Sequence, residues 1–388
     1  MNLQTRKAEL EALLLAHAGL WRPQPFKAAT PAWCEQYPRL AAEALAVPEA
    51  ALEARAADTP GLIRWLARHQ PELAALLPLT ALPAAARRPL PPVTPHVHTH
   101  VPGRKQVQIE AFAAAIGAPR APVLEWCAGL GHLGRRLAAA WQRPVLSLEI
   151  DPALCARGAN LSHGHDQHFL QADVLDPASD RHIEDRHTVA LHACGDLHRR
   201  LVIAAGERRC PALDLAPCCY YRTAQPVYRP LTGGALPLDH DDLRLAVTDT
   251  ATATPRQRQR SRQAMAWKLA FQRLAQDLTG QPYHPLKPVP EAWLAAGFEA
   301  WCRRLADREG LPLPAAVDWP ALEGEGRALA VRVRRLELVR LAFRRALEVW
   351  LVSDLALHLE RQGYRVALAT FCPESVTPRN LLLSARLT

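Results

Sequence analysis

The chain contains no run of 18 uninterrupted apolar residues, and its start does not resemble a secretory leader. The first twenty residues mix acidic and basic side chains, without a long apolar core or a small-residue cleavage site. We therefore expect no membrane span and no signal peptide, and we expect a cytoplasmic, reducing location. No internal repeat is detected.

Cysteines are few and scattered. Nine of the 388 residues are cysteine, an odd number that does not suggest a disulfide framework. Two of them, Cys218 and Cys219, are adjacent. Thiols stay reduced in a cytoplasmic protein, and neighbouring cysteines bridge each other only with strain. We expect both to be free thiols.

The composition is that of a folded protein with a basic surface. Hydrophobic residues make up 49% of the chain, which excludes a disordered protein, and the length allows two or three domains with a substantial core. The formal net charge is +9. This charge favours a polyanionic partner, although arginine is also a generic surface residue in chains rich in alanine and arginine.

The pattern of apolar residues changes along the chain. Residues 1–88 carry apolar side chains at helical spacing, separated by prolines, and predict a helical N-terminal domain. A Pro-rich linker at 89–104 precedes a core at 105–221, in which short apolar runs alternate with helical segments. Residues 222–363 predict a mainly helical insertion with long helices at 255–276 and 338–363, and 364–388 predicts a strand pair.

Strand and helix alternation defines the expected fold. The core predicts strands at 123–129, 144–151, 168–176, 188–196 and 212–220. Apolar strands that alternate with helices form a doubly wound parallel sheet of the Rossmann-like type. The last two runs, 364–371 and 380–387, are joined by a short loop and predict an antiparallel hairpin at one sheet edge.

A glycine motif follows the first strand of the core. Gly129, Gly131 and Gly134 form G-x-G-x-x-G between a predicted strand and a predicted helix. Such glycines let backbone amides approach a ligand at a positively polarised helix end. Nicotinamide or flavin enzymes and S-adenosylmethionine (SAM) methyltransferases share this pattern, and so does a tight turn that binds nothing.

Three acids at successive strand ends favour SAM. Glu125 lies within an otherwise apolar strand, where its carboxylate can reach the ammonium of a methionine-type ligand. Glu149 ends the second strand and can accept two ribose hydroxyls, whereas Asp151 is better suited to begin a helix. Asp173, at the end of the third strand, can accept from an adenine amine. Ligands bind at this edge of open α/β sheets.

A second set of residues ends the fourth and fifth strands, in the sequences HACGD and APCCYY. Cys194, Cys218, Cys219 and His192 could bind a metal, but adjacent cysteines lack the usual C-x₂₋₄-C spacing. A nucleophilic thiolate after Pro217 is a second alternative. We favour a third, in which the cysteines line the site and Tyr220 stacks on the group that is methylated.

Four blocks of sequence carry a resemblance to a known family. They are GRKQVQIEAF at 103–112, LEWCAGLGHL at 124–133, LHACGD…APCCYY at 191–221, and FCPESVTPRNLLLSARL at 371–387. With them the chain resembles the SAM-dependent methyltransferase-like family of the rRNA-adenine-dimethylase-domain-containing proteins. It is more distantly similar to the tRNA acceptor-stem 2′-O-methyltransferases. The resemblance implies a class I methyltransferase sheet with SAM as cofactor.

The site hypothesis has three groups of residues and assigns no metal ligand. The predicted catalytic residues are Asp196, Cys218, Cys219 and Tyr220. The predicted cofactor-binding residues are Glu125, Cys127, Gly129, Gly131, Glu149, Ile150, Asp173, Val174, His192 and Cys194. The predicted substrate-binding residues are Arg104, Lys105, Tyr221, Arg379 and Asn380.

The sequence thus predicts a SAM-dependent methyltransferase whose acceptor is a macromolecule. The basic charge favours a polyanionic partner, and the resemblance implies that this partner is RNA, either rRNA or tRNA. Arginines at 256, 258, 260 and 262 could contact phosphates or form a solvated helix face. The alternatives are a protein side-chain methyltransferase and a non-catalytic SAM-fold scaffold that binds RNA. A nicotinamide oxidoreductase is disfavoured by Glu125 and by the C-terminal strand pair.

Overall fold

The structure is a computed structural model that describes residues 1–248, 253–281 and 283–388. Contacts divide the chain into two units. Unit 1 consists of Met1–Leu15, Ala75–Thr252 and Arg344–Thr388, and unit 2 consists of Ala16–Ala74 and Ala253–Phe343. The segments 1–88 and 222–363, expected as separate regions, each contribute residues to both units.

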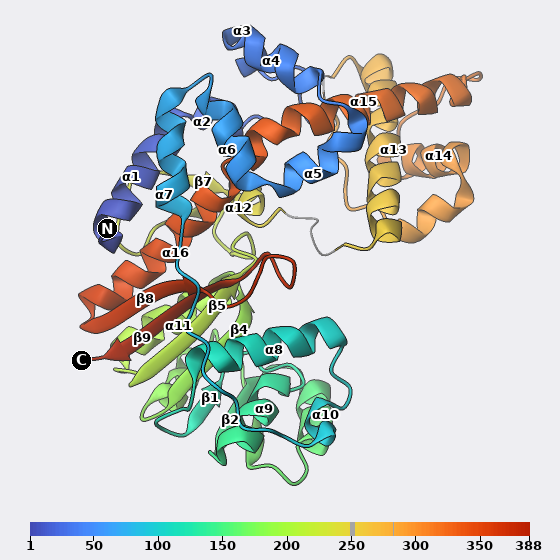
Figure 1. Ribbon diagram of the computed structural model, residues 1–388. Helices are drawn as coiled ribbons and strands as arrows, with labels where there is room; N and C mark the ends of the chain where they lie inside the picture. Colours follow the sequence, from blue (N-terminus) through green and yellow to red (C-terminus); the bar gives the residue numbers. More distant parts are fainter. Residues whose placement is uncertain (249–252, 282) are drawn as a thin grey trace. The chain divides into compact units, whose positions relative to one another are not determined.

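Unit 1 contains a seven-stranded sheet with the order β3-β2-β1-β4-β5-β9-β8 (Figure 1). Its strands are β1 (Val123–Glu125), β2 (Val145–Glu149), β3 (Gln167–Gln171), β4 (His187–Cys194), β5 (Ala212–Cys218), β8 (Tyr364–Thr370) and β9 (Leu381–Leu387). The first five are parallel, whereas β9 is antiparallel to both β5 and β8. The predicted Rossmann-like sheet and its terminal antiparallel hairpin are confirmed.

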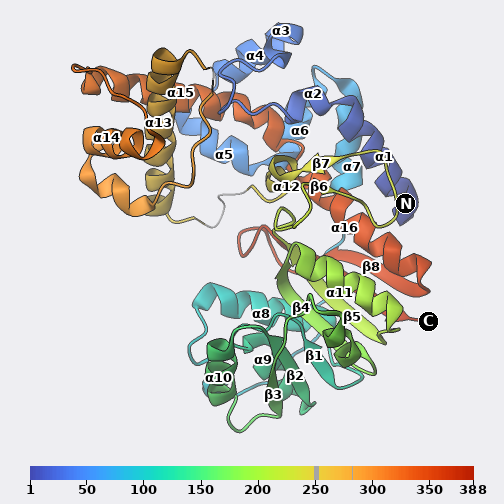
Figure 2. The same cartoon turned by 180° about the vertical axis from the view of Figure 1, so that it is seen from behind.

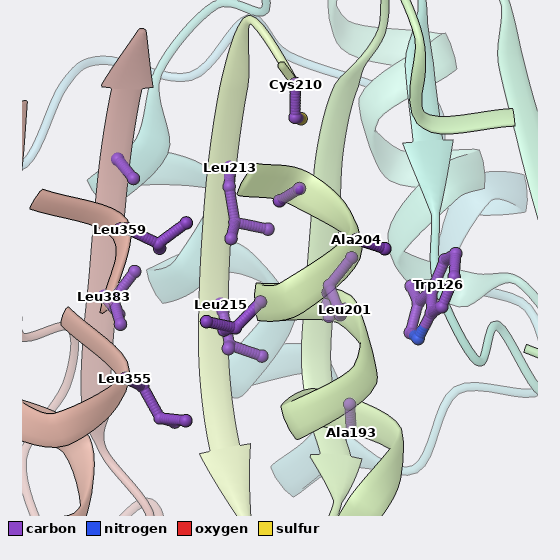
Figure 3. Close-up of a cluster of buried hydrophobic side chains, with 14 of the residues drawn as sticks. Trp126, Ala193, Leu201, Ala204, Cys210, Leu213, Leu215, Leu355, Leu359 and Leu383 are labelled. Carbon is purple, nitrogen blue, oxygen red and sulfur yellow. The ribbon is translucent and has the colours of Figure 1, made fainter. Parts of the chain in front are cut away.

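Helices cover both faces of this sheet because its central strands are apolar on both sides. Leu213 and Leu215, two residues apart on β5, point toward Leu201 of α11 (Asp196–Glu207), as Figure 3 shows. Helix α16 (Arg344–Arg361) packs in the same cluster. The opposite face packs against α8 (Gly103–Ile116) and α9 (His132–Trp141). The view from behind in Figure 2 brings α11 to the front.

A buried polar cluster fastens β9 to the parallel strands. Asp214 of β5 accepts hydrogen bonds from His187 of β4 (2.6 Å) and from Ser384 (2.5 Å) and Arg386 (2.9 Å) of β9. Burial favours the neutral acid, but the His187 hydrogen bond and the Arg386 charge together hold the pKa of Asp214 below its usual value. The carboxylate therefore joins three strands at once.

Smaller elements complete unit 1. They are α1 (Leu3–Ala16, whose last residue falls in unit 2), α7 (Leu76–Thr80), α10 (Pro152–Leu161), β6 (Val227–Tyr228), β7 (Leu238–Asp239) and α12 (His240–Ala246). Strands β6 and β7 form a separate two-stranded sheet. Gly117 follows the last residue of α8, and its φ of 71° suits glycine.

Unit 2 is helical. Its α-helices are α2 (Ala18–Trp21), α3 (Trp33–Gln36), α4 (Pro38–Leu45), α5 (Leu52–Ala57), α6 (Thr59–Ala67), α13 (Pro255–Thr279), α14 (Phe298–Glu309) and α15 (Trp319–Leu341). Trp267, Phe271 and Trp301 pack together between α13 and α14. Gly326 of α15 lets the backbone of α13 approach, because a Cβ there would lie 2.4 Å from the Ala266 carbonyl oxygen.

The prediction of a single long helix at 338–363 is wrong. The structure ends α15 at Leu341 and begins α16 at Arg344, so that the two helices belong to different units. The intervening residues, Ala342 and Phe343, are both fully buried. Neither glycine nor proline marks this break. Among the described helices, none combines the length and the apolar composition that crossing a membrane requires.

Candidate active site

The glycine motif forms the turn between β1 and α9. The backbone N–H of Gly129 donates to Oε2 of Glu149 (2.8 Å), and Gly131 adopts a left-handed conformation with φ of 64° at the start of α9. Among the described residues, no heavy atom lies within 4 Å of a Cβ built on Gly129. The turn therefore leaves room for a ligand at the carboxyl ends of the strands.

Glu149 is held in a fixed position at the end of β2. Its second oxygen, Oε1, accepts from the backbone N–H of Asp151 (3.0 Å). Asp151 itself begins α10 by capping Ala153 (2.8 Å), which confirms its predicted role as a helix start. A carboxylate has about four acceptor positions. Glu149 thus retains capacity for the two hydroxyls of a ribose, as a nucleoside cofactor requires.

Apolar side chains lie exposed beside this carboxylate. Ile150 after β2 and Leu175 after β3 are 58% and 47% exposed, unusual for large aliphatic residues. Asp173 lies between them in sequence, exposed, with one oxygen accepting from the Leu175 backbone (2.9 Å). Val174, between Asp173 and Leu175 in sequence, is buried. Two apolar surfaces and an acid at one sheet edge fit a flat adenine ring and its amine.

Glu125, at the end of β1, is buried and hydrogen-bonded. Only 4% of the residue is exposed, and Oε2 accepts from Ser147 (2.8 Å) and Gln167 (3.4 Å) beneath the glycine turn. Burial raises the pKa of Glu125 to about 7, against the lowering effects of Ser147, of the Gly134 amide and of the Lys105 charge. These bonds join β1, β2 and β3, and the contact of Glu125 with a ligand ammonium stays a prediction.

Several strained residues surround the ends of β1 and β4. Cys127 and His192 have left-handed φ angles of 56° and 69°, which non-glycine residues rarely adopt. Burial raises the pKa of the Cys127 thiol to about 12, so this side chain is an uncharged thiol. His192 lies at an irregularity in the pairing of β4 and β5, and its Nε2 contacts Gln108 of α8 (3.1 Å). Such strain concentrates at functional sites.

Asp196 anchors a loop at the start of α11. Its Oδ2 accepts from the backbone N–H of Ala224 (2.7 Å), and its own N–H donates to the Arg222 carbonyl (3.0 Å). Gly195 permits this approach, because a Cβ there would lie 1.8 Å from the Arg222 oxygen. The observed contacts position the loop after β5, and a catalytic role for Asp196 stays a prediction.

Three cysteine thiols meet where β4 and β5 end. Cys194 pairs with Cys218 in the strand register, and their Sγ atoms are 3.4 Å apart. The sulfur atoms of these two and of Cys219 all lie within 4.8 Å of one another. Hydrogen bonds from the other two thiols, with the charges of Arg379 and Arg222, lower the pKa of Cys219, and the shared proton raises that of Cys218. The pKa values of the two adjacent thiols are therefore shifted in opposite directions.

The two tyrosines, both predicted to belong to the site, differ in their burial. Tyr220, expected to stack on a substrate, is 2% exposed and packs edge-on against the His198 ring. Within the described part of the chain its hydroxyl has no hydrogen-bond partner. Tyr221 is half-buried, and the Arg244 guanidinium lies over its ring at 5.2 Å. Tyr220 as a stacking platform is therefore incompatible with its burial.

The predicted substrate-binding residues divide into two kinds. Lys105 is half-buried, and its charge interacts with Glu125 and Cys218, whereas Arg104 is exposed. Arg379 donates to the Val247 carbonyl and lies close enough to Cys219 to lower its pKa. Asn380 differs, since it is buried and donates to the Cys372 carbonyl (2.8 Å). It therefore closes its own loop and cannot bind a substrate directly.

Three residues of the site escaped the sequence interpretation: Gln108, Leu175 and Arg222. Gln108 is buried and links His192 to the Val376 carbonyl (3.3 Å). Its position one helical turn after Arg104 and Lys105, in GRKQVQ, is a signal that helical spacing could have supplied. Arg222 follows the tyrosines directly, and only the fold of its loop places its charge near Cys219.

Comparison with known proteins shows which kind of domain contains these strand ends. A model of a family described as a methyltransferase domain matches residues 104–226. The cyclopropane synthase MmaA2 from Mycobacterium tuberculosis is similar with a TM-score of 0.25 and 13% identity, over 73% of this chain and 82% of that chain. The 23S rRNA methyltransferase ErmE is similar with a TM-score of 0.25 and 16% identity, over 62% and 97%. None of the curated proteins matches the chain.

The matched segment spans β1 to β5 and so contains every strand end described above. The protein is a SAM-dependent methyltransferase with SAM as its methyl donor. The residues present fit this cofactor, because Glu149 retains acceptor capacity and the exposed Ile150, Asp173 and Leu175 follow the ends of the paired strands β2 and β3. Bound there, SAM supplies an electrophilic methyl group. The chain's own residues bind, orient and shield it.

Proposed function

We propose that the protein methylates RNA, either rRNA or tRNA, at the carboxyl ends of β4 and β5. The observation that carries the proposal is the concentration of cations around the thiol cluster. Arg222 and Arg379 act on Cys219, and Lys105 acts on Cys218. Cations at the methyl-transfer edge attract a phosphate backbone, and the net charge of +9 acts in the same direction.

Positioning is the main task of the protein in such a transfer. The lone pair of the acceptor atom must approach the methyl carbon in line with the bond that breaks, and its proton must leave. Glu149 and the glycine turn would fix the nucleoside end of the cofactor. The loop after β5, held by Asp196, would align the acceptor, while Arg222 and Lys105 bind the flanking phosphates.

Transfer of tritiated methyl groups tests the proposal. Purified protein is incubated with methyl-tritiated SAM and with total RNA or total protein from cells that lack the gene. We expect label in one RNA size class. Label only in a protein band would overturn the RNA acceptor and favour a protein side chain. If calorimetry shows SAM binding but no methyl group is transferred, the proposal of catalysis is overturned. The non-catalytic scaffold that binds RNA then remains as the alternative.

Two variants refine this experiment. Glu149→Gln places an amide donor against the backbone N–H of either Gly129 or Asp151 and should weaken SAM binding by about 10- to 100-fold. Arg222→Ala should raise the KM for RNA and flatten its salt dependence, leaving SAM affinity unchanged. Arg208→Ala is the matched control, since this exposed arginine pairs with Glu184 beyond the opposite end of α11. Equal effects of the two arginine variants would contradict a phosphate contact at the site.

A further inference from the structure

The thiol cluster at the ends of β4 and β5 has the geometry of a metal site. Adjacent cysteines are unusual ligands, since successive residues of an extended strand point to opposite sides. Cys219 departs from extended backbone, with φ of 46°, directly after β5 ends at Cys218. This turn lets both sulfur atoms reach the same side as Cys194. The argument from ligand spacing therefore does not apply to this loop.

The distances between the sulfur atoms suit one small cation. Zinc–sulfur bonds of about 2.3 Å in a tetrahedron place two ligand sulfurs about 3.8 Å apart. The Sγ atoms of Cys194 and Cys218 are 3.4 Å apart, and all three lie within 4.8 Å of one another. A disulfide would require about 2.05 Å, and the three are free cysteines. Small movements of side chains would centre a cation among them.

The charges around the cluster give independent support. Three thiolates and a divalent cation leave one negative charge, and Lys105, Arg222 and Arg379 all lie close enough to offset it. Among the described residues, no fourth Cys, His or acidic atom belongs to this group. Structural zinc sites have four protein ligands, whereas sites with three keep an open position.

We propose that Cys194, Cys218 and Cys219 bind one zinc-like divalent cation through three thiolates, with the fourth position open at the methyl-transfer edge. This site goes beyond the proposed function, because it requires neither RNA nor SAM. A cation with an open position can hold an acceptor atom that has a lone pair, whichever macromolecule carries it. Thiolate ligands favour zinc, cadmium or cobalt over magnesium or calcium.

Titration of the reduced, chelator-treated full-length protein with Co²⁺ tests the site without any activity measurement. We expect a thiolate-to-cobalt charge-transfer band in the near ultraviolet that saturates at one equivalent and disappears when Zn²⁺ is added. Tighter binding at higher pH should follow, since thiols lose their protons on binding. Absence of the band from the reduced protein would overturn the proposal.

Cysteine variants assign the ligands. Cys194→Ser and Cys219→Ser should each weaken Co²⁺ binding by at least about 100-fold and lower the band intensity. Cys218→Ser should have the same effect. Because Cys218 is buried, this variant could fail to fold, and the variants of the half-buried Cys194 and Cys219 then decide the question. Cys210→Ser, at a buried cysteine before β5, and Cys34→Ser in unit 2 are controls that should bind normally. An unchanged band in both Cys194→Ser and Cys219→Ser, or an equal loss in the controls, would overturn the assignment.

Discussion

At the scale of single residues, Glu125 shows how burial changes the meaning of an acid. Its carboxyl is buried among Ser147, Gln167 and the Gly134 amide, with a pKa raised from 4.5 to about 7. Above pH 7 both the folded and the unfolded chain carry the charge, and folding must bury it. A shift of this size corresponds to about 3 kcal/mol of lost stability.

Replacing Glu125 with glutamine should remove this pH dependence. Below pH 4.5 the carboxyl is neutral in both states and costs nothing. As the pH rises toward 7, the unfolded chain loses the proton first, so the wild-type protein loses stability. The free energy of unfolding of Glu125→Gln, relative to wild type, should therefore increase by up to about 3 kcal/mol between pH 4.5 and pH 8.

Urea denaturation across this pH range measures the effect. Glu184→Gln is a suitable control, because Glu184 is an exposed acid paired with Arg208 and should show no comparable trend. Parallel pH profiles of wild type and Glu125→Gln would contradict the proposed burial cost.

The residue scale is also where prediction from sequence was weakest. The sequence located the strand ends and so placed Glu149, Asp173 and Cys194 at one edge. It could not tell which of two adjacent side chains faces inward, and so placed Tyr220, which is buried, at the substrate together with the half-buried Tyr221. The direction of a side chain after a strand depends on local φ angles, and composition and spacing carry no such information.

At the scale of elements, the turn between β4 and α11 depends on one glycine. Gly195 has a φ of 54°, and a Cβ there would overlap the Arg222 carbonyl. Gly195→Ala should therefore destabilise the protein by about 3 kcal/mol and displace the loop that carries Cys219. Thermal or urea unfolding measures the loss. Gly164→Ala is the matched control.

Gly164 separates backbone strain from steric overlap. It also has a positive φ, 84°, but among the described residues no atom lies within 4 Å of its Cβ position. Gly164→Ala should cost only the backbone strain of about 1 kcal/mol. Similar losses at both positions would show that the approach of the Arg222 carbonyl contributes little.

Elements themselves were largely predictable. Alternating apolar runs located every strand of the main sheet, because these strands are buried on both faces and flanked by helices with clear periodicity. The break between α15 and α16 was missed, since Leu338 to Leu347 is continuously compatible with a helix. The break coincides with the boundary between the two units.

At the scale of the whole molecule, unit 1 is assembled from segments that lie far apart in the sequence. Lys7 of α1 donates to the Gly233 carbonyl (2.6 Å) and lies 3.9 Å from Asp354 of α16. Asp354 is fully buried and accepts from Tyr228 and Thr232. This lysine therefore connects the first segment of the unit to the two others.

Lys7→Met should consequently destabilise the methyltransferase unit by about 2–4 kcal/mol, because a buried acid loses its nearest cation. Urea unfolding at neutral pH gives the loss. Lys287→Met, at an exposed lysine in unit 2, should change stability by less than about 0.5 kcal/mol. If Lys7→Met lowers the free energy of unfolding no more than Lys287→Met does, the stabilising contact of Lys7 with the other two segments is contradicted.

The position of β9 inside the sheet has a consequence for biosynthesis. β9 lies between β5 and β8 and is fixed by Asp214, yet the ribosome makes it after both. While the second segment of unit 2 is translated, β5 has an unpaired edge in the nascent chain. Such edges invite pairing with other chains. Newly made protein should therefore depend on chaperone protection until β9 has emerged from the ribosome.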